Sequence, residues 1–306
     1  MFGDTLAIRV AERESQIVLG LDPDPAALWP GGAGEPPHGS AAERAGEAVL
    51  GHCRALIDAT AEVCVAVKLQ LACFERLGAH GWSTLEAVAA HARGQGLLVI
   101  ADGKRGDISV SAAAYAQALL GGVQTPFGDL PGLGADLLTV NPLMGTDAIE
   151  PFVSAARAAG AGVLVLVRTS NPGAADVEDL ELRGGGAVWE RVAAIVEALG
   201  APGVGKAGLS DVGAVMGATA PGHLARAREL MGNATFLLPG VGAQGGRVED
   251  LAPAFVPGRA GGLVTASRSI ANAHLQSGAE PASAARAEAE RLRERAWALS
   301  DRLLTA

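Results

Sequence analysis

The segment LLVIADGKRGD, residues 97–107, decides the fold because an apolar run passes directly into a charged, glycine-containing run. Residues 97–101 are continuously apolar, which is typical of a strand covered on both faces in a parallel sheet. The polar residues that follow mark the carboxyl end of this strand. Active sites of α/β barrels collect where the strands end. The segment therefore predicts a buried parallel strand with a functional site at its end.

The same pattern recurs along the whole chain. Each short apolar run is followed by a Gly/Pro/Asp-rich turn and then by a longer Ala-rich helical stretch, which indicates βαβ units. The candidate strands are residues 16–21, 63–69, 97–101, 136–140, 162–167, 211–216, 235–238 and 261–266. A closed barrel covers such strands on both faces, so we expect an α/β fold of the (β/α)8 TIM-barrel type.

The helical stretches and loops are expected to complete one domain. Helices are predicted at residues 83–93, 147–159, 187–199, 222–231 and 281–304. The last has an apolar face that should pack against the barrel exterior. Gly/Pro-rich insertions near 30–40 and at 121–134 are expected to be loops, because the strand–helix periodicity resumes after both. A chain of 306 residues fits one large barrel, so we expect a single domain over residues 1–306.

Composition excludes several classes of protein. The net charge of −9 and the lack of a basic run with interleaved aromatics argue against a nucleic-acid partner. The longest apolar stretches, such as residues 163–167, are far shorter than the roughly 20 residues that span a bilayer. Residues 1–13 lack the apolar run of a secretory signal, so a cytoplasmic location is expected. Cys53, Cys64 and Cys73 lack C-x-x-C spacing and are expected to be reduced packing residues.

Three consecutive predicted strands end in charged residues. Asp22 follows the first, Lys68 lies at the end of the second, and Asp102 and Lys104 follow the third. Each alone is compatible with an ordinary turn or surface residue. Together they must converge across the mouth of a barrel. Asp102 and Lys104 are two positions apart and share a face of an extended segment. The set predicts a row of alternating charges in which the lysines stay protonated.

A second motif suggests a phosphate site. Residues 240–245 match G-x-G-x-x-G after a predicted strand, so a dinucleotide site is an alternative. Such a site needs a carboxylate about 20 residues further on, and no Asp or Glu lies between Asp250 and Glu280. Barrels often bind phosphate with the loops after their last two strands. The residues predicted to bind it are Gly240, Gly242, Gly245, Gln244 and Arg268. The six histidines form no zinc-ligand pair, and no G-x-S-x-G motif is present.

These motifs resemble those of the orotidine 5'-phosphate decarboxylase family. That family carries an aspartate after strand one, a lysine after strand two and D-x-K-x-x-D after strand three, similar to Asp22, Lys68, Asp102, Lys104 and Asp107 here. Residues 141–147, 168–173, 239–246 and 266–270 resemble its later loops in the same order. The arrangement looks most like the longer bacterial subgroup.

The resemblance implies an enzyme without cofactor or metal that converts orotidine 5'-phosphate to uridine 5'-monophosphate and carbon dioxide in pyrimidine biosynthesis. Lys104 would stabilise the C6 carbanion and protonate it, beside Asp102, while Asp22 and Lys68 orient the row and bind ribose hydroxyls. Further substrate contacts implied by the resemblance are Ser170 at the pyrimidine, Pro239 and Ser267. Many family members have glycine where Ser267 stands, so its side chain is expected to crowd the phosphate.

The resemblance also implies a homodimer with shared active sites. In the family the last aspartate of the signature enters the neighbouring subunit's site, which assigns that role to Asp107, with Ile108 and Ser111 nearby. Two alternatives stay open: a magnesium-dependent sugar-phosphate decarboxylase or aldolase on the same barrel, and a non-catalytic phosphate-binding barrel. Lys68 argues against the first, because those relatives carry an acidic metal ligand after strand two. An intact lysine–acid row would have no purpose in the second.

Overall fold

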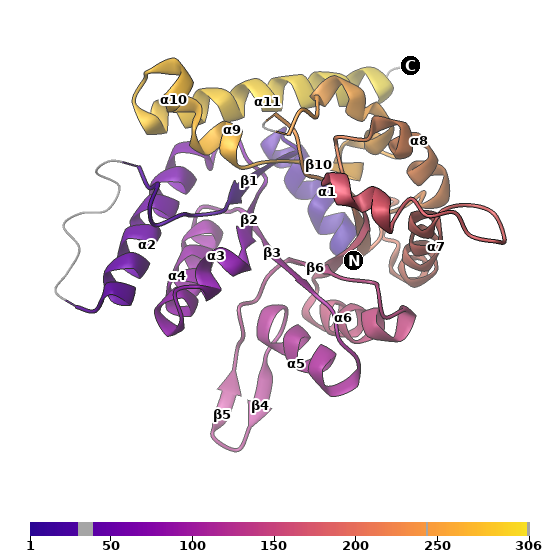
Figure 1. The fold of residues 1–306 in the computed structure, drawn as a ribbon, viewed down its shortest axis with the longest axis horizontal. Helices are drawn as coiled ribbons and strands as arrows, with labels where there is room; N and C mark the ends of the chain where they lie inside the picture. Colours follow the sequence, from indigo (N-terminus) through magenta and orange to yellow (C-terminus); the bar gives the residue numbers. More distant parts are fainter. Residues whose placement is uncertain (30–38, 243, 305–306) are drawn as a thin grey trace.

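The computed structural model describes residues 1–29, 39–242 and 244–304, and within them eight parallel strands close into a barrel (Figure 1). The order around the barrel is β1-β10-β9-β8-β7-β6-β3-β2. The strands are β1 (Ile17–Leu21), β2 (Ala66–Gln70), β3 (Leu98–Arg105), β6 (Leu137–Val140), β7 (Gly162–Arg168), β8 (Val212–Met216), β9 (Phe236–Leu238) and β10 (Gly262–Ala266). Each overlaps a predicted strand, and the predicted TIM barrel is confirmed. The insertion expected near 30–40 lies largely outside the described residues.

Helices surround the barrel on its outer face. The longer ones are α2 (Ala41–Thr60), α4 (Ala79–Gly94), α5 (Ser109–Leu119), α6 (Thr146–Ala159), α7 (Val188–Gly200), α8 (Pro221–Leu230) and α11 (Pro281–Leu304). Short helical turns are α3 (Leu71–Glu75), α9 (Arg268–Ala271), α10 (Ala273–Ser277), η1 (Pro172–Asp176), η2 (Ala201–Gly203), η3 (Val248–Phe255) and η4 (Arg259–Gly261). The five predicted helices are present. Helices α2 and α5 were not predicted, although Ser40 and Glu43 form a capping box at the start of α2.

The first helix, α1 (Phe2–Arg13), closes the amino-terminal end of the barrel and was also not predicted. Its buried residues Phe2, Leu6 and Val10 belong to one apolar cluster with Leu98 and Leu137, the first residues of β3 and β6. In Figure 1 this indigo helix lies across the centre of the ring of strands. Because α1 covers the amino ends of the strands, the opposite end is left for a site.

The last helix packs on the barrel exterior as predicted. Leu292 and Ala296 are buried on the face of α11 that contacts α2 and η3. Cys53, Cys64 and Cys73 are free thiols. Cys53 and Cys64 are buried in the same apolar cluster as Leu292 and Ala296, in agreement with the packing role predicted for them. In the described part of the chain, no helix is both long and apolar enough to cross a membrane.

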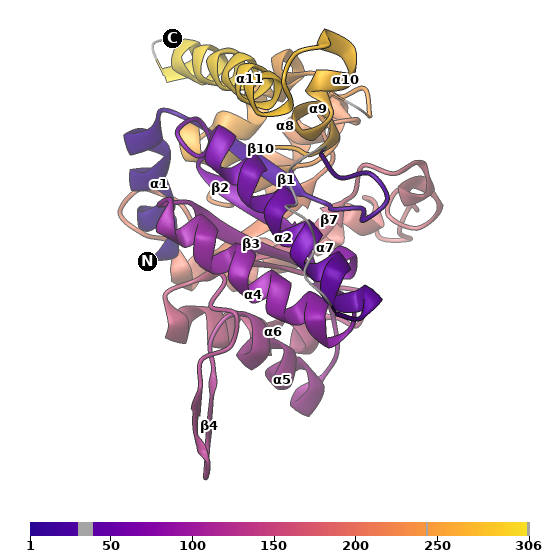
Figure 2. The ribbon, with the colours of Figure 1, turned by 90° about the vertical axis from the view of Figure 1, so that its left-hand side faces the viewer.

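The insertion at residues 121–134 is a hairpin, not the loop predicted. It contains β4 (Val123–Thr125) and β5 (Gly128–Leu130), and Figure 2 shows it projecting away from the barrel. The Thr125 hydroxyl donates to the Gly128 carbonyl at 2.7 Å, and Gly128 has a φ of 116°. Glycine adopts this conformation without steric cost, so it allows the tight turn that a composition-based loop assignment overlooks.

Candidate active site

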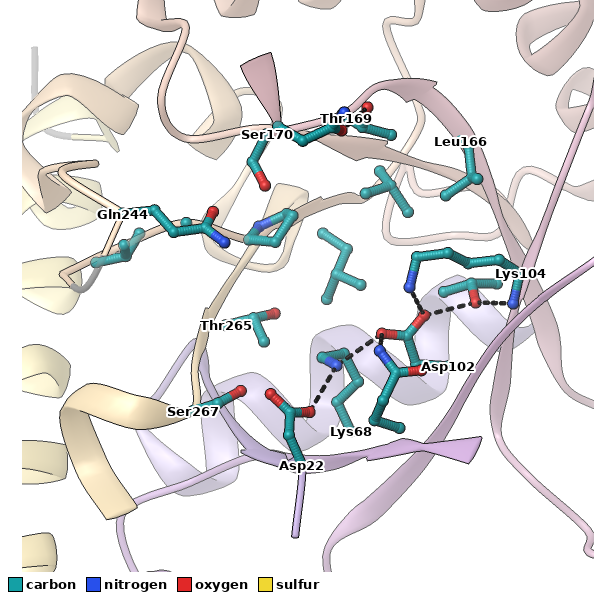
Figure 3. Close-up of a pocket in the computed structure, with 18 of the residues that line it drawn as sticks. Asp22, Lys68, Asp102, Lys104, Leu166, Thr169, Ser170, Gln244, Thr265 and Ser267 are labelled. Atoms are coloured by element: carbon teal, nitrogen blue, oxygen red, sulfur yellow. Dashed lines mark hydrogen bonds and ion pairs between the residues drawn. The ribbon is translucent and has the colours of Figure 1, made fainter. Parts of the chain in front are cut away.

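A cavity of about 480 Å³ opens at the carboxyl ends of the barrel strands. Figure 3 shows how the side chains from these strands point toward one another around it. Ten of the residues singled out in the sequence line it: Asp22, Lys68, Asp102, Lys104, Ser170, Pro239, Gly240, Gln244, Ser267 and Arg268. Five others, Asp107, Ile108, Ser111, Gly242 and Gly245, are not among its lining residues. The strand-end rule thus located the cavity.

The predicted row of alternating charges is present on one side of this cavity (Figure 3). Lys68 Nζ lies 2.6 Å from Asp102 Oδ2 and 3.5 Å from Asp22 Oδ1. Lys104 Nζ lies 2.7 Å from Asp102 Oδ1. Asp102 therefore stands between two ammonium groups, and Lys68 stands between two carboxylates. Each charge in the row has an opposite neighbour at contact distance.

Burial and charge together fix the protonation of the inner pair. Lys68 and Asp102 are 6% and 4% exposed. Burial raises the pKa of the Asp102 carboxyl, but the neighbouring Lys68 and Lys104 ammonium groups outweigh burial and lower this pKa from 3.8 to about 2. Burial lowers the pKa of Lys68, whereas Asp102 and Asp22 raise it, with a net increase above 10.5. Both groups are therefore charged at neutral pH.

The strand that carries this row is longer than predicted. β3 runs to Arg105, so Asp102 and Lys104 are strand residues and do not lie in the following loop. The pairing of β3 with β6 shifts between Ala101 and Arg105, and Lys104 adopts a left-handed φ of 47°. An irregular, polar strand end has no apolar signal, which is why the pattern placed the end of the strand at residue 101.

Two uncharged residues that were not predicted also bind the row. Gln70 Nε2 donates to Asp102 Oδ2 at 3.3 Å, and the Thr139 hydroxyl donates to Asp102 Oδ1 at 2.9 Å. Gln70 is two positions after Lys68 and shares its strand face, so the same spacing argument that joined Asp102 to Lys104 was sufficient to find it. Thr139 lies within an apolar run and carries no such signal.

The floor of the cavity is apolar. Leu166, Val215 and Leu237, from β7, β8 and β9, line it beside the charge row. Apolar walls reduce the local dielectric and strengthen the interaction of the lysines with any anion that enters. The cavity thus combines a row of paired lysine and aspartate charges with an apolar wall.

The predicted phosphate loop lies across the mouth from the charge row. Gly240, Gly242 and Gly245 have φ values of 99°, 77° and 89°, so this turn depends on glycine. Gln244 and Arg268 line the cavity on this side. Gly242 and Gly245 shape the turn without lining the cavity, and the intervening residue 243 lies outside the described residues. This side of the cavity therefore has the amide side chain of Gln244 from the loop and the guanidinium of Arg268 from the start of α9.

The loop after β7 forms a second wall that the sequence only partly indicated. Ser170 lines the cavity as predicted, and so does Glu178, which was not predicted. Glu178 accepts hydrogen bonds from the Thr169 N–H at 2.8 Å and from the Thr169 hydroxyl. Arg168 holds Asp179 through two bonds of 2.8 Å. These contacts fold the loop against the end of β7.

The last aspartate of the D-x-K-x-x-D signature is not among the residues that line this cavity. Asp107 accepts a hydrogen bond from the Ile108 N–H at 2.8 Å, and Ile108 is 49% exposed. Ser111 is exposed on the first turn of α5. Val110, 83% exposed, and Leu143, 80% exposed, add to the apolar surface carried by this segment and the loop after β6. In a single chain Ile108 and Ser111 are therefore exposed, whereas Asp107 is half-buried.

Comparison with known proteins gives a consistent result. A family model described as "Orotidine 5'-phosphate decarboxylase / HUMPS family" matches residues 15–287. The chain is 48% identical over 216 residues to orotidine 5'-phosphate decarboxylase of Deinococcus radiodurans, covering 70% of this chain and 74% of that relative. It resembles the solved Leishmania donovani OMP decarboxylase with a TM-score of 0.72 and 30% identity, covering 98% of this chain and 99% of that one. The Leishmania donovani UMP synthase matches with a TM-score of 0.71 and 31% identity over 95% of this chain, which spans only 56% of that protein.

Proposed function

This chain belongs to the orotidine 5'-phosphate decarboxylase / HUMPS family, and we propose that it removes carbon dioxide from orotidine 5'-phosphate to give uridine 5'-monophosphate. The resemblance drawn from the motifs is confirmed at the level of the family. The observation that carries the proposal is the row Asp22–Lys68–Asp102–Lys104, with contacts of 3.5, 2.6 and 2.7 Å. Such a carboxy-lyase supplies the pyrimidine nucleotide at the end of its biosynthesis.

The row suits a reaction that generates a carbanion. Loss of carbon dioxide from C6 leaves a carbanion that the pyrimidine ring delocalises poorly, so the site must supply positive charge. Lys104 Nζ is fixed by Asp102 at 2.7 Å, and its side chain is 44% exposed toward the cavity. A preorganised ammonium group stabilises developing negative charge without reorganising and then donates its proton to C6. The pair of electrons left by the C–C bond thus ends in a new C–H bond.

The remaining charged groups have supporting roles in this proposal. Asp102 would lie beside the substrate carboxylate, where repulsion between the two negative charges disfavours the bound ground state. Asp102 also accepts hydrogen bonds from Lys68 and Lys104 and so holds both lysines. Asp22 and Lys68 orient the row and bind ribose hydroxyls. Lys68 is the more constrained of the two because it is buried between two carboxylates.

Phosphate binding is assigned to the opposite side of the cavity. Gln244 and Arg268 present donors there beside the glycine turn around Gly240, and Ser170 and Pro239 also line the cavity. Binding energy from a remote phosphate stabilises the closed arrangement around the reacting ring. In this proposal the pyrimidine lies over Leu166, Val215 and Leu237, next to the charge row.

The magnesium-dependent alternative is disfavoured by the position of Lys68. Its ammonium group occupies the space between Asp22 and Asp102, the two carboxylates that a divalent cation would use. A cation there would displace a buried lysine from both partners or lie against its charge. We therefore retain decarboxylation of the nucleotide as the proposed reaction.

We also propose a homodimer that completes each site. Ile108, Val110, Ser111 and Leu143 are exposed, and the half-buried Asp107 directly precedes Ile108. Large apolar side chains at this level of exposure mark a candidate protein interface where they form a contiguous patch. In such a dimer Asp107 would enter the neighbouring subunit's cavity.

Turnover of orotidine 5'-phosphate by the purified protein is the direct test. Release of carbon dioxide and appearance of uridine 5'-monophosphate are expected, with the same rate after exhaustive dialysis against EDTA. A rate that is abolished by EDTA and restored by magnesium would instead support the sugar-phosphate reaction class, and substrates of that class would then be assayed. Lys104→Arg, which keeps a cation but lacks a transferable proton near neutral pH, serves as the matched inactive control.

A further inference from the structure

Thr139 lies between the two charged residues on which the proposed reaction depends. It is on β6, the neighbour of β3, and is 1% exposed. Its hydroxyl donates to Asp102 Oδ1 at 2.9 Å and accepts from the Lys104 main-chain N–H at 2.9 Å. One hydroxyl group therefore contacts both the carboxylate of Asp102 and the backbone of Lys104.

The backbone of Lys104 needs such a contact. Its φ of 47° is in the left-handed region, which residues with a side chain rarely adopt and which persists only where surrounding contacts determine it. The regular pairing of β3 with β6 is interrupted between Ala101 and Arg105. At this interruption the Lys104 N–H donates to the Thr139 hydroxyl. In a regular parallel sheet, a backbone carbonyl of the neighbouring strand would accept this hydrogen bond.

The direction of the Lys104 side chain follows from this backbone conformation. The φ angle of Lys104 sets the direction of its Cα–Cβ bond and therefore of the whole side chain. At the far end of this side chain, Nζ is held by its hydrogen bond to Asp102 Oδ1. Thr139 also donates to that same oxygen. Loss of the hydroxyl would therefore release Lys104 at its backbone and alter the acceptor that holds its ammonium group.

We propose that Thr139 is a positioning residue for the proton donor of this site: its hydroxyl holds Lys104 in the left-handed conformation and keeps Asp102 Oδ1 directed at the Lys104 ammonium group. The proposal rests on the proposed decarboxylation and refines it. Thr139 acts through Lys104 and Asp102, so its removal should affect turnover more than binding.

Three variants separate positioning from packing. Thr139→Val keeps the shape of the side chain and removes the hydroxyl, whereas Thr139→Ser keeps the hydroxyl and removes a methyl group. Thr235→Val is the matched control, because Thr235 is also buried, its hydroxyl donates to the Ala260 carbonyl at 3.1 Å, and it does not line the cavity.

Steady-state kinetics on orotidine 5'-phosphate and binding of uridine 5'-monophosphate are measured for each variant. Thr139→Val is expected to lower kcat at least tenfold, with KM and the product dissociation constant changed less than threefold. Thr139→Ser should retain kcat within threefold. Thr235→Val should lose thermal stability and keep kcat within twofold. Equal losses of kcat in the Ser and Val variants, or an unchanged kcat in the Val variant, would overturn the proposal.

A readout without substrate distinguishes failure of this inference from failure of the proposed function. Amide hydrogen exchange at Lys104 reports directly on the bond to Thr139. Exchange should accelerate at least tenfold in Thr139→Val and stay near the native rate in Thr139→Ser and Thr235→Val. A native protein that does not turn over orotidine 5'-phosphate would refute the proposed function, whereas unchanged exchange in Thr139→Val would refute the positioning role.

Discussion

Ser267 lies so close to Gly20 that a Cβ atom on Gly20 would be 1.8 Å from the Ser267 hydroxyl oxygen. The two residues are on adjacent chain segments, because β1 pairs with β10 and Leu19 is in register with Ala266. The serine side chain therefore fits only because residue 20 has no side chain. Gly20 and Ser267 both line a second, smaller pocket that shares Asp22, Ser267 and Arg268 with the active-site cavity.

Replacing Gly20 should therefore destabilise the fold in a way that depends on Ser267. Gly20→Ala is expected to lower the free energy of unfolding by about 1–3 kcal/mol through overpacking. Ser267→Gly in the same chain should recover most of this loss, since it removes the clashing oxygen. Urea denaturation of the two single variants and the double variant measures the coupling.

Gly94→Ala is the control for this cycle. Gly94 is the last residue of α4. Apart from its chain neighbours and its own helix backbone, no heavy atom of the described residues lies within 4 Å of a Cβ atom added there. This position should therefore accept alanine without loss of stability. Additive effects of Gly20→Ala and Ser267→Gly would show that the two residues do not compete for space.

Arg268 should contribute mainly to binding. It lines the cavity at the start of α9, on the side opposite Lys104. Arg268→Ala is expected to weaken binding of uridine 5'-monophosphate by about 2–5 kcal/mol if the guanidinium pairs with phosphate in a desolvated site. Free guanidinium ion should partly restore kcat/KM of Arg268→Ala. It should have no effect on Lys104→Ala, which serves as the control for nonspecific rescue, and rescue of both variants would contradict the assignment.

Much of the barrel could be predicted from the sequence because each strand is a continuous apolar run. The site was found because Asp22 and Asp102 follow two such runs and Lys68 lies at the end of a third, and the carboxyl ends of parallel strands meet at one end of a barrel. Helix α1 was overlooked although its buried residues Phe2, Leu6 and Val10 recur every four residues, which is a helical period. Residues 1–13 were considered only as a possible secretory signal, and the short amphipathic pattern was not used.

The contacts that refine the site are less accessible from sequence. Thr139 lies in the run Leu-Leu-Thr-Val and has the spacing of a core residue, although its hydroxyl binds Asp102 and Lys104. The left-handed backbone of Lys104 depends on the shifted pairing between β3 and β6. Both features arise from packing of neighbouring strands, which no local pattern encodes. The expectation that Ser267 crowds the phosphate likewise omitted its contact with Gly20.

Asp102 should contribute to stability in a pH-dependent manner. Its pKa is about 2 in the folded protein against an ordinary value of 3.8, so the ionised carboxylate stabilises the fold above pH 3.8 and this stabilisation is lost as the pH falls toward 2. Asp102→Asn leaves Lys68 buried beside a neutral partner and should cost about 3–5 kcal/mol at pH 7. The difference in the free energy of unfolding between the native protein and Asp102→Asn should shrink by about 1 kcal/mol between pH 5 and pH 3. At pH 3 roughly half of the stabilisation by the Asp102 carboxylate is lost.

Urea denaturation at pH 7, 5 and 3 provides the measurement for Asp102. Asp129→Asn, on the exposed hairpin strand β5, is the matched control and should differ from the native protein by less than about 0.5 kcal/mol at each pH. A deficit for Asp102→Asn that stays constant down to pH 3 would mean that the carboxylate is not held ionised by Lys68 and Lys104.

The proposed dimer predicts complementation between two inactive variants. Lys104→Ala removes the proton donor from the subunit's own cavity, and Asp107→Ala removes the residue that would enter the partner's cavity; each variant alone should be nearly inactive. In a mixed dimer, one of the two cavities would hold neither residue and the other would hold both. Subunit exchange at equal concentrations should therefore restore about one quarter of native activity, because half of the dimers are mixed and each has one intact site. Native mass spectrometry of differently tagged chains verifies that mixed dimers have formed. Mixed dimers without activity would show that Asp107 does not act across the interface.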